Sequence, residues 1–167
     1  MNRMATRFRS SFFVTLMGLS AGSAFAQTPT EFINDASAQS VAEIEASRLA
    51  HQKSESKEVK DYTIVVINDR TTANQHLAKI ARQLDLPVAP REEVVDKAKT
   101  LMPQVMDGSN FDEAYAASQV STTEKAIEQL EQTAQTTDVP ELKAYAEETL
   151  PKLQNHLQMA RALQASR

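Results

Sequence analysis

Asp69 and Arg70 are the residues most able to do chemistry in the middle of the chain, where they follow the apolar run 63-TIVVI-67. Adjacent residues on a helix do not face each other, so these two charges cannot neutralise one another. No residue three or four positions from either one carries an opposite charge. A charge that points into a core needs a partner from another helix, because burying it unpaired is costly. Glu43, on another helix, is therefore the first candidate to pair with Arg70, and Asp69 is kept as the second.

Glu43, Asp69 and His156 form a candidate metal site, because three nitrogen or oxygen ligands can hold a divalent ion. Arg70 at the same level counts against a metal, since its charge is permanent and it cannot act as a ligand. Two alternatives stay open. His156 can be a core histidine that bonds to a neighbour, and Glu43 can turn to solvent.

Residues for other kinds of catalysis are missing from the sequence. A carboxylate di-iron site needs a Glu-x-x-His pair on each of two helices, but Leu153 and Ala73 stand three residues before His156 and His76. The chain has no cysteine and no Gly-rich loop, and no serine has a histidine partner that spacing can assign. We expect no catalytic residues, no cofactor and no enzymatic activity.

The segment from Ser56 to Leu84 must position Asp69 and Arg70. Its β-branched run is typical of a strand that ends at Asn68. A helical wheel, however, puts seven residues on one face over seven turns. These are Val59, Tyr62, Val66, Ala73, Leu77, Ile80 and Leu84. A strand explains only the first third of that pattern, so we predict one continuous helix.

The other elements are also predicted to be helical. A capping-box spacing at Thr28 to Glu31 begins the first helix, which ends near Gln52. A long connection follows Pro87, with a short amphipathic segment at 91–106 that Pro103 interrupts. Two further helices are expected over 111–134 and from Pro140 onward. With a single glycine after residue 26, tight hairpins are disfavoured, and an all-α fold follows.

Residues 1–26 have the features of a cleaved signal peptide. Three arginines precede the apolar stretch 11-SFFVTLMGLSAGSAFA-26, and Ala24-Phe25-Ala26 fits a cleavage site before Gln27. The apolar stretch is shorter than the ~20 residues of a membrane-spanning helix. We expect a periplasmic protein with one helical domain over 27–167 and no transmembrane span in the mature chain. The full sequence has a net charge of −4 and no basic stripe, which argues against nucleic acid as a partner.

Several segments resemble a family of exported bacterial helical proteins with a ferritin-like fold, a domain of unknown function whose members often carry the label putative outer membrane protein. The matching segments are 42-AEIE-45, 48-RLA-50, 59-VKDY-62, 69-DRTTAN-74, 111-FDEAY-115, 119-QV-120 and 150-LPKLQNHLQMARAL-163. The resemblance implies a four-helix bundle whose long crossover carries a short helix between the second and third bundle helices. It also implies that family members carry histidine where this chain has Arg70 and Thr123, while His156 is kept.

These positions are expected to share one level of the bundle. With about 1.5 Å of rise per residue, Arg70 lies about 21 Å along its helix. Glu43, Thr123 and His156 are expected at similar distances along the other three helices. We therefore predict a structural polar layer made by Glu43, Asp69, Arg70, Thr123 and His156.

The sequence thus predicts an exported, non-catalytic bundle that binds a protein or an envelope component, with a role in envelope maintenance or stress. The alternative is a ferritin-like protein that holds a metal or a small ligand in the polar layer.

Overall fold

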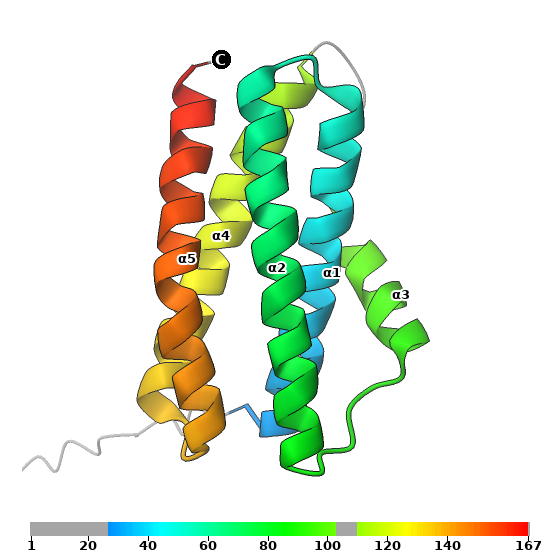
Figure 1. Cartoon of the computed structure of the whole chain (residues 1–167), viewed down its shortest axis with the longest axis vertical. Coiled ribbons are helices and arrows are strands. Elements are labelled where there is room, and N and C mark those ends of the chain that lie inside the picture. The colour runs from blue at the N-terminus through cyan, green and yellow to red at the C-terminus, as the bar shows by residue number, and fades with distance from the viewer. Residues whose placement is uncertain (1–26, 103–109, 167) are drawn as a thin grey trace, which may run out of the picture.

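The computed structural model describes residues 27–102 and 110–166, and these residues form five helices and no strand. The helices are α1 (Pro29–Lys53), α2 (Lys57–Gln83), α3 (Arg91–Leu101), α4 (Phe111–Thr136) and α5 (Pro140–Ala165). Four long helices stand side by side, and the short α3 lies outside them against α1 (Figure 1). The expected all-α fold is confirmed for the described residues. None of their helices is long and apolar enough to cross a membrane.

Helix α2 runs through the β-branched segment without interruption, so the prediction of a continuous helix is confirmed. Thr63 and Val66 are buried, whereas Ile64 is 48% exposed. Only part of the β-branched run therefore faces the core, as expected for a helix. The apolar stripe that continues to Ile80 packs the whole helix against its neighbours, and this packing outweighs the strand preference of the run.

The predicted start of α1 is also confirmed. Thr28 Oγ1 accepts a hydrogen bond from the backbone N–H of Glu31 at 3.2 Å, and the Glu31 carboxylate accepts one from the Thr28 N–H at 2.9 Å. This reciprocal capping box satisfies two amide groups that the first turn leaves free.

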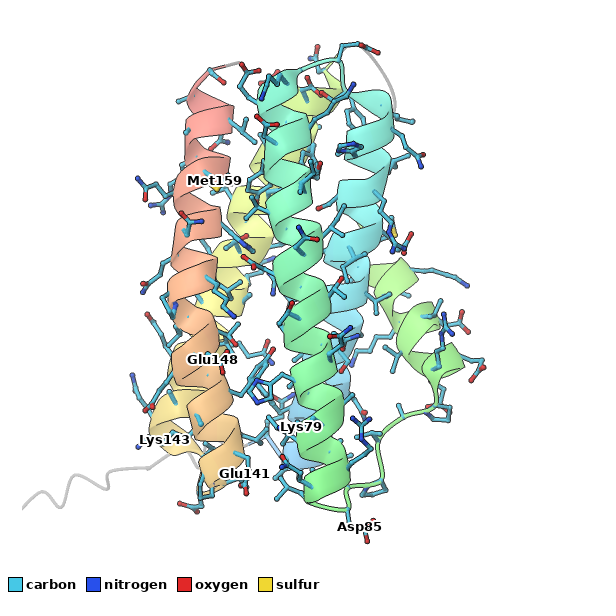
Figure 2. All side chains as sticks on the ribbon, viewed as in Figure 1. Lys79, Asp85, Glu141, Lys143, Glu148 and Met159 are labelled. Carbon is cyan, nitrogen blue, oxygen red and sulfur yellow. The ribbon has the colours of Figure 1, made fainter. Side chains whose placement is uncertain are left out.

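The end of α2 directs the chain toward α3. Asp85 has a φ of 49°, in the left-handed region, and the Leu86 N–H bonds to the Ala81 carbonyl at 3.0 Å. This is the arrangement by which many helices end and turn sharply. Figure 2 shows Asp85 at this end of α2. Of the predicted segment 91–106, residues 91–101 form α3, and Pro103 lies outside the described residues.

Two hydrophobic clusters fill the interior at different levels of the long helices. The first contains Phe32, Leu77, Leu130 and Leu153 among others, and the second contains Ala50, Val59, Tyr115 and Leu163 among others. On each of the four long helices, buried polar residues lie between the two clusters.

Candidate functional site

A buried polar layer separates the two hydrophobic clusters. Glu43 of α1, Arg70 of α2, Thr123 of α4 and His156 of α5 are between 1% and 6% exposed. Asp69, the fifth residue of the predicted layer, has a side chain that is 35% exposed. The structure therefore places four of these residues in the core and Asp69 at its margin.

Tyr62 of the second hydrophobic cluster contacts the polar layer. Its hydroxyl donates a hydrogen bond to Gln119 Oε1 at 3.1 Å, and its ring makes an edge contact with His156, with 6.5 Å between ring centroids. Burial raises the pKa of Tyr62 well above its usual value, and the Glu43 carboxylate raises it further, whereas the Arg70 guanidinium opposes the shift. Tyr62 therefore stays protonated and remains a hydrogen-bond donor to Gln119.

His156 contacts Asp69 across the interface between α2 and α5. Its Nε2 lies 2.8 Å from the Asp69 carboxylate, which accepts the hydrogen bond. Burial lowers the pKa of His156, the hydrogen bond to Asp69 opposes this, and the charge of Arg70 lowers the pKa further. A neutral ring that donates from Nε2 fits these surroundings, so the interaction is a hydrogen bond to a carboxylate near neutral pH. His156 is thus a core histidine bonded to a neighbour, one of the two alternatives left open above.

The expected pairing of Arg70 with Glu43 or Asp69 is wrong. Within the described residues Arg70 makes no ion pair, and Asp69 bonds to His156 instead. The reason is geometric, because consecutive residues on a helix point about 100° apart. Arg70 points inward, while Asp69 lies at the margin beside α5. The Glu43 side chain is buried as well, which excludes the alternative that it turns to solvent.

Three buried atoms in this layer have no hydrogen-bond partner among the described protein atoms. They are Glu43 Oε2, Arg70 Nε and Gln119 Nε2. Two of them are donors and one is an acceptor, so the layer can form further hydrogen bonds.

The metal candidates do not come together as a ligand set. In the part of the chain that the structure describes, no three histidine, aspartate or glutamate side chains are close enough to hold an ion. Asp69 and His156 are in contact, but Glu43 does not complete a site with them.

Other polar contacts of the interior were absent from the sequence prediction. Ser47 and the Tyr115 hydroxyl are 2.8 Å apart, and His51 Nδ1 lies 2.9 Å from Thr63 Oγ1. A buried tyrosine normally finds a partner for its hydroxyl. The core-facing positions of Tyr62 and Tyr115 were therefore a signal for further polar partners, but they do not identify Gln119 or Ser47.

A second candidate site lies on the outside of the bundle. A groove of about 910 Å³ runs between α1, α2, α3 and the segment that joins α2 to α3. Its apolar lining comes from Ile33, Val41, Ile44, Ala81, Val94 and Val95, among others. This size and composition are typical of sites for small molecules. Sequence reasoning missed this groove, since it depends on where α3 docks.

A few contacts hold α3 at the groove. Lys97 forms an ion pair with Asp35 of α1, and Ala98 is buried against the bundle. The backbone N–H of Ala89 also donates to Asn34 Oδ1 at 2.8 Å, which holds the connecting segment on α1. These contacts leave the space between α1 and α3 open along the groove.

Three arginines and two acidic residues line the groove. Arg48 is already paired with Glu45 at 2.6 Å. Arg82, near the end of α2, and Arg91, the first residue of α3, make no ion pair with any described residue. One end of the groove therefore carries two arginines without an ion pair, together with the carboxylate of Asp85.

Comparisons with known proteins identify a family without an assigned activity. No curated protein and no solved structure matches the chain. A family model described as a domain of unknown function, DUF4142, matches residues 15–163. The match covers most of the chain, and the expectation of a family of unknown function is confirmed. The protein belongs to the DUF4142 family.

Proposed function

We propose that the protein is exported through a cleaved signal peptide over residues 1–26 and acts in the periplasm by binding, without catalysis. In this proposal the long helices form a ferritin-like bundle with α3 on the crossover, and the protein serves envelope maintenance or stress. The features at the N-terminus and the order of the helices support it. Oxidase or hydrolase turnover in an activity screen would contradict the non-catalytic role.

The groove beside α3 is the observation that carries the binding role. It is large enough for a small molecule, it is mostly apolar, and it opens on the surface of the bundle. The polar layer, by contrast, is closed by side chains that are at most 6% exposed. A ligand can therefore reach the groove without opening the core.

Native mass spectrometry of the protein, purified without detergent from the periplasm of cells that export it, tests the proposal. The chain should begin at Gln27 and carry an adduct. The variant Ala78→Trp should lose the adduct, because Ala78 lines the groove. Ala162→Trp, at an exposed alanine of α5 outside the groove, should retain it. A chain that still carries residues 1–26 would contradict cleavage of the signal peptide, and an adduct that survives Ala78→Trp would contradict binding in the groove.

A second candidate function is binding of a metal or a small ligand in the polar layer. The observation that favours a small ligand is the set of three buried atoms without partners, Glu43 Oε2, Arg70 Nε and Gln119 Nε2. It does not favour a metal, because the two nitrogens are N–H donors that cannot coordinate an ion. Elemental analysis of the protein purified from the periplasm tests the metal form of this candidate. Zinc or iron at one ion per chain would support it, and a metal-free protein would leave only a small ligand.

A further inference from the structure

The groove is more basic than the rest of this acidic chain. The whole sequence has a net charge of −4, yet the groove has three arginines against Glu45 and Asp85. Because Glu45 holds Arg48, Arg82 and Arg91 are the two arginines left for a ligand. Asp85 also lines this end, so its two arginines and one carboxylate leave an excess of one positive charge. The acidic residues of the first turn of α3, Glu92 and Glu93, do not line it.

The positive charges and the apolar lining are arranged along the length of the groove. Arg82 and Arg91 belong to the end where α2 finishes and α3 begins. Val41, Ile44 and Val95 continue the lining along α1 and α3. On α1, the lining extends from Ile33 to Arg48, which corresponds to about 22 Å of helix. An elongated ligand with one charged end fits this arrangement.

We infer that the groove binds a free monoacyl carboxylate, with the carboxylate at Arg82 and Arg91 and the acyl chain along α1 and α3. This inference rests on the proposed binding function of the groove. Arginine suits the role, because its planar donors can engage a carboxylate through two hydrogen bonds. Burial of the acyl chain against the valine and isoleucine side chains supplies the apolar part of the binding free energy.

Calorimetric titration of the mature chain with dodecanoate and with neutral dodecanol, both as monomers, tests the inference. The double variant Arg82→Gln, Arg91→Gln should bind dodecanoate about tenfold to a hundredfold more weakly, which is the usual effect of losing charge-assisted hydrogen bonds. Its affinity for dodecanol should not change. Both arginines are exposed, and circular dichroism should show an unchanged helix content.

A matched control removes two positive charges from positions outside the groove. Lys79 of α2 and Lys143 of α5 are exposed and do not line it, and Figure 2 shows both on the surface of their helices. The variant Lys79→Gln, Lys143→Gln should bind dodecanoate as the parent does. An equal loss of affinity in this control would mean that only the net charge matters, and this would overturn the inference.

The remaining outcomes separate this inference from the proposed function. If both probes bind equally, the arginine variant has no effect and Ala78→Trp abolishes binding, then the groove binds ligands but carboxylate recognition is overturned. If neither probe binds, the inference is overturned, and the adduct experiment above still decides the proposed function. Binding to phosphatidylglycerol vesicles through the two arginines, without dodecanoate binding, would overturn the free carboxylate in favour of a membrane surface.

Discussion

The two sides of α1 show how one helix can serve a closed interior and an open surface. Its inner side carries Glu43 and Ser47, which are 5% and 0% exposed. Its outer side carries Val41 and Arg48, which line the groove beside α3. Polar groups on the inner side lie among the fixed side chains of other helices, whereas two arginines facing the groove have no ionic partner in the described chain. The interior layer is therefore suited to specify the bundle, and the groove is suited to bind.

The largest expected difference between the two regions is in their contribution to stability. Leu77 is fully buried in the core, and Leu77→Ala should lower the free energy of unfolding by about 2–5 kcal/mol because it leaves a cavity. Val94 is half-buried in the groove wall, and Val94→Ala should cost less than about 1 kcal/mol. Urea unfolding measures both, and equal losses would contradict the division into core and groove.

A smaller effect on stability is expected from the coupling between the two buried charges of the layer, Glu43 and Arg70. Glu43 and Arg70 act in opposite directions on Tyr62, although they form no ion pair. We expect the double variant Glu43→Gln, Arg70→Met to lose less stability than the two single variants together, with a coupling of about 0.5–3 kcal/mol. Urea unfolding of all four proteins gives this value. Strict additivity would mean that the two charges do not compensate each other.

The pH dependence of stability should show the smallest effect. The pKa of His156 in the fold is below its ordinary value of 6.5, so the unfolded chain takes up the proton first as the pH falls. The free energy of unfolding should therefore decrease from about pH 6.5 downward, to the pKa of folded His156. His156→Gln should remove this part of the dependence. A free energy of unfolding that increases in the parent as the pH falls over the same interval would contradict this prediction.

Much of the helical structure could be predicted from local patterns. The apolar stripe from Val59 to Ile80 outweighs the β-branched run in the same segment, and the capping box at Thr28 marks a helix start that the structure retains. The expectation of one polar layer grouped Glu43, Arg70 and His156 at the same level of the bundle, and these residues are buried.

The pairing of those residues could not be predicted in the same way. A helical wheel gives the face of a residue but not the rotation of that helix against its neighbours. That rotation determines that Asp69 forms its hydrogen bond with His156. It also determines that Arg70 makes no ion pair among the described residues. The groove depends on the docking of α3, whose few anchoring contacts, such as Lys97 with Asp35, have no local signature.

A titration of the ¹⁵N-labelled mature protein with dodecanoate, followed by NMR, tests the central claim that ligands bind on the outer side of α1. Chemical shift changes are expected at the amides of Val41, Arg82 and Val95, which line the groove. The side-chain amide of Gln119, in the closed layer, should not shift. The opposite result, with the largest changes at Gln119 and His156 and none along the groove, would contradict the account and move the binding site into the interior.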